Sequence, residues 1–485
     1  MSAPRQGPRP SRGPVQRRGG RPGRAPRAGH PGGDPARRAA YEVITAVHRD
    51  DAYANLVLPR VLRHAGLSGR DAAFATELAY GTLRAVGTLD AIVADAARRD
   101  VDRIDPPVRD GLRLGAYQLL HTRVPPHAAV STTVDLIRGL APAAAGFANA
   151  VLRRIAERDL AGWLAQLAPP PDTDPIGHLA LVHSHPRWIV RAFADALGGD
   201  LEETVAALAA DNERPPVHLA ARPGRISVAE LAAEAGGRPG RWSPYAVVLA
   251  GGAPAQVPAV GDGRAHVQDE GSQLVALACA AAPLSGPDVR WLDLCAGPGG
   301  KAGLLGALAA ERGAAVTAVE VAPHRAELVA AATRGLPVTV LTADGRSVGE
   351  HPALPAGGFD RVLVDAPCTG LGALRRRPEA RWRRGPDDLP ALTRLQRELL
   401  AAALRAVRPG GVVTYATCSP HLAETRATVD EALRRATSPV RALDARPLLP
   451  DGMPGLGAGP DVQLWPHRHG TDAMFLAVLA REHGP

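Results

Sequence analysis

Apolar residues follow two different spacings along the chain, and the change between them divides it into parts. In the first third they recur every three or four positions, as in residues 111–120, which predicts an all-helical bundle over residues 36–160. Over residues 266–485 short apolar runs alternate with helical stretches, the pattern of a mostly parallel sheet in an α/β domain. A Pro-rich break at residues 169–171 opens a mixed span, which we interpret as a small linking domain over residues 161–265.

The N-terminal 35 residues differ from the rest in composition. Residues 1–35 are rich in arginine, proline and glycine and contain almost no large apolar side chain, so we expect a disordered tail. Ten arginines and one acid lie in residues 1–38, whereas the whole chain carries a net charge of +8, so the remainder is close to neutral. The tail either keeps the protein in solution or acts as a non-specific RNA-binding arm, and these roles are compatible.

Long apolar runs are absent, and the cysteines are few. No run approaches the ~18 residues of a membrane-spanning helix, and charges and prolines stand where a signal peptide has its apolar stretch. We therefore expect a cytoplasmic, monomeric protein without a membrane anchor. The cysteines form no CxxC pair, which argues against structural disulfides and against a metal site; they are Cys279, Cys295, Cys368 and Cys418.

A glycine-rich loop lies between a short apolar strand and a helix. It consists of Cys295, Ala296, Gly297, Pro298, Gly299, Gly300 and Lys301. Such a turn lets the backbone approach a ligand and directs free helix amides at it, which indicates a nucleotide-like cofactor. It matches neither GxGxxG nor GxxxxGK[ST], so NAD and ATP are disfavoured. Lys301 is the single lysine beside 56 arginines, which suggests that this position needs a compact ammonium group.

Four successive predicted strands end in an acidic residue. These residues are Asp293, Glu320, Asp344 and Asp365. Because ligands of open α/β sheets bind at the carboxyl ends of the strands, the four acids define one rim. Helix capping would explain any single one of them, but all four together favour a ligand site.

Two cysteines also follow strands of the predicted sheet. Cys368 comes three residues after Asp365, and Cys418 follows the apolar run 412–417. Both therefore lie at the rim, and both thiols can face one cleft. A lone cysteine is more often a small buried apolar residue, which is our interpretation of Cys279.

Three motifs and the N-terminal helices resemble known families. The motifs are similar to those of the RsmB/Sun family of rRNA cytosine-5 methyltransferases; they are Asp293-Leu294-Cys295-Ala296-Gly297-Pro298-Gly299-Gly300-Lys301, Asp365-Ala366-Pro367-Cys368-Thr369-Gly370 and Thr417-Cys418-Ser419-Pro420. The helices of residues 36–160, with the closing run 146–155, resemble the NusB family of RNA-binding domains, although a plain structural bundle has the same pattern.

The resemblance implies a multidomain protein. Its parts would be an N-terminal all-α NusB-like bundle, a small linking RNA-binding domain, and a class I, Rossmann-like methyltransferase domain that uses S-adenosylmethionine (SAM). The implied reaction is methylation of carbon 5 of a cytosine in rRNA, with 16S rRNA expected, through a covalent bond from Cys418 to carbon 6. Cys368 would assist release of the product. DNA cytosine-5 methyltransferases use the Pro-Cys cysteine as the nucleophile, so the presence of both motifs favours RNA.

The same resemblance assigns the remaining site residues. The loop from Cys295 to Lys301 would hold SAM, Glu320 its ribose and Asp344 its adenine edge. Asp365 would contact both the methionine end and the target base, so it counts as catalytic with the two cysteines.

A basic cluster follows Cys368 in an otherwise nearly neutral body. Its members suit phosphate contact and base stacking, so we expect them to bind RNA; they are Arg375, Arg376, Arg377, Arg381 and Trp382. A solvated surface without a ligand is the alternative.

Two other functions stay open at this stage. One is a non-catalytic RNA-binding factor with a relic methyltransferase fold, against which the intact loop, acids and paired cysteines argue. The other is a Rossmann oxidoreductase, against which the missing GxGxxG argues. The residues do not separate rRNA from tRNA as the substrate.

Lys301→Arg tests whether the single lysine marks a constraint. We expect the substitution to weaken SAM binding by about 10-fold, because a planar guanidinium replaces a compact ammonium. Isothermal titration of SAM into both proteins measures the effect, and an unchanged affinity would contradict the inference.

Overall fold

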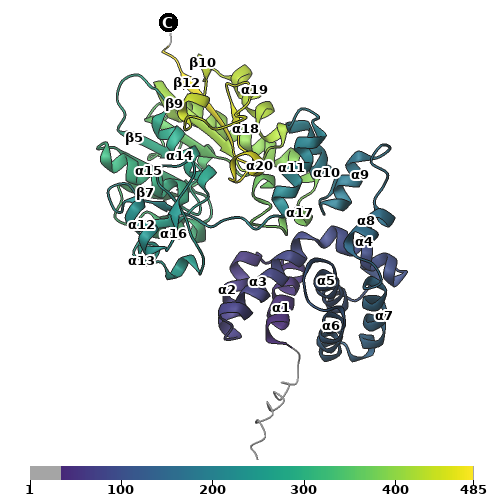
Figure 1. The fold of residues 1–485 in the computed structure, drawn as a ribbon. Helices are drawn as coiled ribbons and strands as arrows, with labels where there is room; N and C mark the ends of the chain where they lie inside the picture. Colours follow the sequence, from purple (N-terminus) through teal and green to yellow (C-terminus); the bar gives the residue numbers. More distant parts are fainter. Residues whose placement is uncertain (1–33, 484–485) are drawn as a thin grey trace, which may run out of the picture.

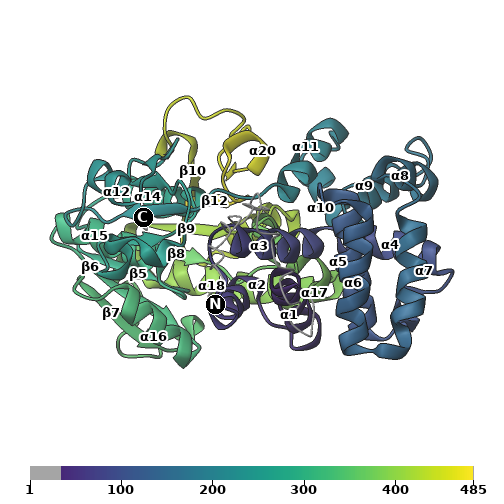
Figure 2. The same cartoon turned by 60° about the horizontal axis from the view of Figure 1, so that its bottom comes forward.

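The computed structural model describes residues 34–483, so residues 1–33 of the predicted tail lie outside the described residues. Figure 1 shows a helical N-terminal part (residues 34–167, purple and blue) against a C-terminal part built on a sheet (residues 268–483, green and yellow). A linking part, residues 168–267, runs between them. In the second view, the helices of the N-terminal part again lie beside the sheet (Figure 2).

The N-terminal part is the helical bundle that the apolar spacing predicts. The side chain of Asp34 accepts a hydrogen bond from the Arg37 amide and caps the first helix. Buried residues such as Val43, Val47 and Trp163 share one core, so the bundle continues past residue 160. Its helices are α1 (Pro35–Arg49), α2 (Ala54–His64), α3 (Gly69–Arg84), α4 (Val86–Ala97), α5 (Pro106–His121), α6 (Pro126–Leu140), α7 (Ala145–Ile155) and α8 (Leu160–Leu167).

The linking part contains two packing units. Helices α9 (Pro175–Val182), α10 (Arg187–Ala196) and α11 (Leu201–Asn212) share a core with residues of the C-terminal part, among them Leu371 and Trp465. A small antiparallel sheet with its own core follows, in the order β2-β3-β1-β4. Its elements are β1 (His218–Ala221), α12 (Val228–Glu234), β2 (Arg238–Pro239), β3 (Ala246–Val248), α13 (Pro258–Gly261) and β4 (Ala265–Val267).

The C-terminal part is built on an eight-stranded sheet. The path through it is β10-β12-β9-β8-β5-β6-β7, in which β5 to β9 run parallel and β12 antiparallel, while β11 pairs with β12. This confirms the mostly parallel, Rossmann-like prediction. The strands are β5 (Arg290–Asp293), β6 (Ala315–Glu320), β7 (Val338–Thr342), β8 (Phe359–Asp365), β9 (Val407–Thr417), β10 (Val440–Leu443), β11 (Val462–Gln463) and β12 (Phe475–Arg481).

Strand residues alternate between two apolar cores, one on each face of the sheet. Trp291 and Leu363 pack into the core that includes residues of α14 and α15, whereas Leu292 and Val362 pack into the core that includes residues of α18 and α19. Helix α16 lies on the same face as α14 and α15, with Val329 against Ala318. These helices are α14 (Glu270–Ala281), α15 (Gly300–Glu311), α16 (Pro323–Ala332), α18 (Leu389–Ala406) and α19 (Arg426–Arg435); α20 (Pro466–His469) lies between β11 and β12.

The strand order reverses at the centre of this sheet. The chain moves from β5 to β6 and β7 on one side, and then returns to β8 and β9 on the other. A crevice forms outside the carboxyl ends of the strands at such a point, and ligands of α/β sheets bind there. The topology therefore places a binding site beyond the ends of β5 and β8.

One segment of the C-terminal part contacts both other parts. This junction segment, residues 375–384, contains α17 (Ala380–Arg383). The Arg381 side chain is fully buried, and its guanidinium donates to the carbonyl oxygens of Arg84 (3.1 Å) and Ser184 (3.2 Å). It also donates to Asn212 Oδ1 at 2.8 Å and to the Asp211 carbonyl at 2.9 Å. One side chain thus joins the bundle, the linking helices and the sheet part.

Neighbours of Arg381 strengthen the same junction. The guanidinium of Arg383 donates to the Val47 carbonyl at 3.1 Å, and the Ala54 amide donates to Glu379 Oε1 at 3.2 Å. A Cβ on Gly87 would lie 2.5 Å from the Trp382 ring, so the bundle accepts this ring only at a glycine. The junction segment therefore sets the position of the bundle relative to the crevice.

Arg381→Ala should lower the free energy of unfolding by about 3 kcal/mol, because four oxygen acceptors lose their buried donor and a cavity remains. Differential scanning calorimetry measures the change. The control is Arg384→Ala, since Arg384 is 44% exposed and pairs only with Asp388 at 3.6 Å, so we expect a change within about 0.5 kcal/mol. Equal effects of the two substitutions would refute the structural role of Arg381.

Candidate active site

The glycine-rich loop packs closely against its surroundings. A Cβ on Gly297 would lie 2.1 Å from Glu320 Oε2, and Gly299 has a φ of 110°, where a Cβ would lie 2.7 Å from Ala332. Both positions therefore require glycine. The loop leads from β5 into α15 and lines a cavity of about 660 Å³, a size typical of ligand sites.

The predicted acids lie at the ends of their strands, but their environments differ. Asp293 is completely buried, and burial raises its pKa to about 7, with a further contribution from the charge of Asp365. Glu320 is buried behind Gly297, 3.4 Å from the Arg325 guanidinium. Asp344 is 41% exposed and pairs with Arg346 at 2.6 Å. Asp293 and Asp365 line the cavity, whereas Glu320 and Asp344 lie outside its lining.

The parallel register of β8 and β9 brings two thiols together. Asp365 lies opposite Ala416, so the loops that follow these strands begin side by side. Cys368 Sγ and Cys418 Sγ are 3.4 Å apart as a result. Cys295, by contrast, lies in the cofactor loop, where burial raises its pKa well above the usual range.

The two thiols have opposite pKa shifts. A hydrogen bond from the Cys368 thiol lowers the pKa of Cys418, and the charges of Lys301 and Arg377 lower it further against the effects of burial and Asp365. The same hydrogen bond raises the pKa of Cys368, and burial adds to this. Negative charge therefore concentrates on Cys418, because the cations face Cys418.

Lys301 is held in the centre of the site by a carboxylate. Its Nζ lies 2.8 Å from Asp365 Oδ2, and its side chain is 11% exposed. Burial alone would lower the pKa of Lys301, but the charge and hydrogen bond of Asp365 raise it, so the ammonium stays charged.

Glu424 is a residue of this site that the sequence did not indicate. It is fully buried and accepts hydrogen bonds from the Thr369 amide at 2.8 Å and from Ser419 Oγ at 2.6 Å. Thr369 and Ser419 directly follow the two cysteines, so one carboxylate fixes both loops. Glu424 lies six residues after Cys418 in a stretch without apolar periodicity, and no pattern separates it from a surface acid.

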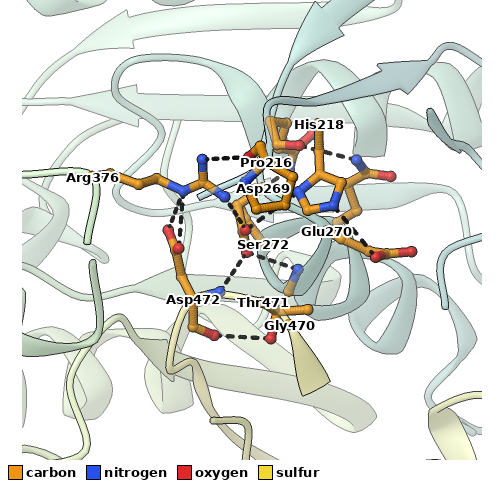
Figure 3. A network of polar contacts seen from close by, with 12 residues as sticks. Pro216, His218, Asp269, Glu270, Ser272, Arg376, Gly470, Thr471 and Asp472 are labelled. Carbon is orange, nitrogen blue, oxygen red and sulfur yellow. Dashed lines mark hydrogen bonds and ion pairs between the residues drawn. The ribbon is translucent and has the colours of Figure 1, made fainter. Parts of the chain in front are cut away.

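Two arginines of the predicted RNA-binding cluster are bonded to acids near the cavity. Figure 3 shows Arg376 between Asp269 and Asp472, at 2.6 Å and 2.9 Å, and it also donates to the Pro216 carbonyl at 3.0 Å. Arg375 is buried and donates to Asp472 at 3.0 Å. Arg376 therefore joins the linking part, through Pro216, to the C-terminal part, whereas Arg375 bonds within the C-terminal part.

The predicted RNA-binding residues therefore fall into two groups. Arg375 and Arg381 are buried and bonded within the chain, which does not fit the expected RNA contact, because their donors already have partners. Arg376 is likewise paired with acids. Arg377 is exposed and lines the cavity, and Trp382 is 41% exposed. Arg377 and Trp382 present the most free surface of the five, while Arg376 keeps a partly exposed side chain in the cavity wall.

Two kinds of feature are absent from residues 34–483. No helix in this range is long and apolar enough to cross a membrane. No group of three or more histidine, cysteine or acidic side chains in the same range could hold a metal ion.

Comparisons with known proteins agree with this architecture. Residues 282–480 match the family described as 16S rRNA methyltransferase RsmB/F, and residues 34–157 match the NusB family. A protein of Mycobacterium tuberculosis is 62% identical over 450 residues, which cover 92% of this chain and 97% of that protein. The ribosomal RNA small subunit methyltransferase B of Escherichia fergusonii is 34% identical over 394 residues, which cover 79% of this chain and 85% of that protein.

A solved structure shares the fold across nearly the whole chain. The crystal structure of PH0851 gives a TM-score of 0.77 at 22% identity and covers 92% of this chain and 98% of its own. Fold and comparisons together define a methyltransferase with a Rossmann-like domain behind a NusB-like bundle. The chain belongs to the RsmB/F family of 16S rRNA methyltransferases, which confirms the resemblance of its motifs.

Cys368→Ala should move the pH dependence of Cys418 alkylation to higher pH. Removal of the thiol that donates to Cys418 leaves burial and Asp365, both of which raise the pKa of Cys418. Iodoacetamide labelling over a pH series, followed by peptide mass spectrometry, measures the profile. Cys279→Ala is the control, because Cys279 is buried in α14 with a pKa of about 11. If the pH profile of Cys418 alkylation is the same in Cys368→Ala as in the native protein, Cys368 does not control the ionisation of Cys418.

Proposed function

We propose that this protein transfers a methyl group from SAM to carbon 5 of a cytosine in RNA, and that 16S rRNA carries the target. The pair of thiols supports this most directly, because Cys368 Sγ and Cys418 Sγ lie 3.4 Å apart beside the ion pair of Lys301 and Asp365. A reaction at carbon 5 of cytosine needs one group to attack the ring and another to help its release.

The residues of the loop fit SAM. Glycines at 297 and 299 let the backbone approach a ligand, and the cavity has room for both a nucleoside and a base. The loop from Cys295 to Lys301 would hold the cofactor. Glu320 would bind its ribose hydroxyls, and Asp344 would share its carboxylate between Arg346 and the adenine edge. When bound, SAM supplies the methyl group.

Cys418 is the group that we assign to attack. Its thiolate adds to carbon 6 of the cytosine, which forms the S–C6 bond and moves the C5–C6 electron pair towards carbon 5. Carbon 5, a weak nucleophile in the free base, can then accept a methyl group. The hydrogen bond from Cys368 and the charge of Lys301 lower the pKa of Cys418, and the Asp365 carboxylate can accept a hydrogen bond from the amino group of the base.

Cys368 is the group that we assign to release. While Cys418 is ionised, its charge raises the pKa of Cys368. Once Cys418 is bound to carbon 6 that charge is gone, so Cys368 loses its proton to solvent more easily. The Cys368 thiolate can then take the proton from carbon 5, after which the C5–C6 double bond reforms and the S–C6 bond breaks. Glu424 keeps both cysteine loops in place for the two steps.

The choice of substrate rests on family and domain organisation. Relatives are named as ribosomal RNA small subunit methyltransferase B, and the bundle matches the NusB family. The names of the relatives and of the matching family support ribosomal RNA over tRNA, and the bundle supports binding of RNA in general.

Cys418→Ala should abolish methyl transfer, whereas Cys368→Ala should accumulate an enzyme–RNA adduct that resists SDS. The substrate is unmodified 16S rRNA transcribed in vitro, with tritiated SAM as the donor. Cys279→Ala should keep full activity. Bisulfite sequencing of total RNA from a deletion strain would locate the cytosine. Full activity of Cys418→Ala would refute its assignment, and the absence of an adduct with Cys368→Ala would refute the release role.

A further inference from the structure

Arg84, the last residue of α3, is a buried arginine whose guanidinium lies over the Tyr80 ring at 5.7 Å but has no hydrogen bond or ion pair among residues 34–483. It is 9% exposed, and its Nε atom is buried without a hydrogen bond. Among residues 34–483 no carboxylate lies within 4.0 Å of its guanidinium, and the Arg381 contact described above involves only its backbone carbonyl. A ring face replaces only part of the hydration that a buried guanidinium loses, so the charge of Arg84 still calls for an anion.

Glu77 offsets the charge of Arg84 only from a distance. Its carboxylate acts on the pKa of Arg84 but forms no ion pair with it, and it accepts the hydroxyl of Tyr117 at 2.6 Å. Burial lowers the pKa of Arg84, and the like charge of Arg214 lowers it further against the effects of Glu77, Tyr117 and Tyr80. Arg381 is a second buried cation close by, since its pKa responds to Arg84.

Arg84 lies in the wall of the cavity that contains the thiols. The cavity of about 660 Å³ is lined by Lys301, Asp365 and Cys418 and also by residues of the bundle; the latter are Asn55, Thr76, Glu77, Tyr80 and Arg84. Arg214, which is exposed, lines this cavity and a neighbouring one of about 200 Å³ that Arg84 shares. The acids Asp269 and Asp472 in the same cavity are already paired with arginines.

We propose that Arg84, together with Arg214, binds a phosphate group of the RNA strand whose target base enters the cavity. A phosphodiester supplies the missing negative charge, and its oxygens match the planar donors of a guanidinium. Phosphate contacts set the register of a strand, and the base contacts then select the nucleotide. The NusB-like bundle thereby contributes a substrate contact to the active site. This inference rests on RNA as the substrate in the proposed function.

Arg84→Met tests the site through RNA binding, which should weaken, and through thermal stability, which should not fall. Binding to unmodified 16S rRNA transcribed in vitro, measured by filter binding without SAM, should weaken by about 10-fold. The slope of log affinity against log salt should become shallower by about one unit. The melting temperature of the free protein should stay the same or rise, because the substitution removes an unpaired buried charge.

Arg99→Met is the matched control. Arg99 belongs to the same bundle, is exposed, packs over Phe147 and does not line the cavity, so affinity and slope should stay as in the native protein. If Arg84→Met matches this control, the inference is wrong. A lower melting temperature of Arg84→Met would also overturn it, because Arg84 would then stabilise the fold.

A second experiment, with inorganic phosphate, distinguishes an RNA phosphodiester from free phosphate as the ligand of Arg84. If inorganic phosphate raises the melting temperature of the native protein but not of Arg84→Met, while RNA affinity is unchanged by the substitution, the site binds free phosphate and the RNA assignment is overturned. The binding assay needs no methyl transfer. A failure of native protein to form 5-methylcytosine would therefore refute the proposed reaction alone.

Discussion

The parallel register between β8 and β9 brings together the two cysteine loops of the site. Asp365 stands opposite Ala416, so the loops after the two strands start together and carry their thiols to a separation of 3.4 Å. Glu424 then joins the residues that follow each thiol. A shift of one residue in this register would turn every side chain of β9 to the opposite face and separate the cysteines.

Charge around the thiols is distributed unequally, and this gives two chemically identical groups different properties. The hydrogen bond between the thiols has the largest effect, lowering the pKa of Cys418 and raising that of Cys368. Lys301 and Arg377 lower the pKa of Cys418 further against Asp365, whereas Glu424 adds to the rise for Cys368. The difference favours the thiolate at Cys418 and the thiol at Cys368. It provides a physical basis for the division of labour that the family resemblance implies.

Arginines make several of the polar contacts between the parts of the chain. Arg381 and Arg376 each donate to groups from separate parts, and both are largely enclosed. The planar fork of a guanidinium suits this role, because it satisfies several carbonyl and carboxylate oxygens at once. Arg84 is enclosed in the same region and lacks such partners. Buried arginines of two kinds can therefore be distinguished. Arg381 and Arg376 are bonded to groups of the chain, whereas Arg84 is available to a ligand.

Much of the fold and part of the site follow from the sequence alone. Apolar spacing determines the bundle and the parallel sheet, since local periodicity decides which face of each element is buried. Motifs at the strand ends locate the glycine-rich loop, the acids and both cysteines, since parallel strands bring their carboxyl ends to one edge. The functions of the arginines and of Glu424 were decided only by the tertiary structure. Arg381 and Arg84 lie 297 residues apart in sequence, and whether an arginine is buried and bonded depends on contacts that no local pattern contains.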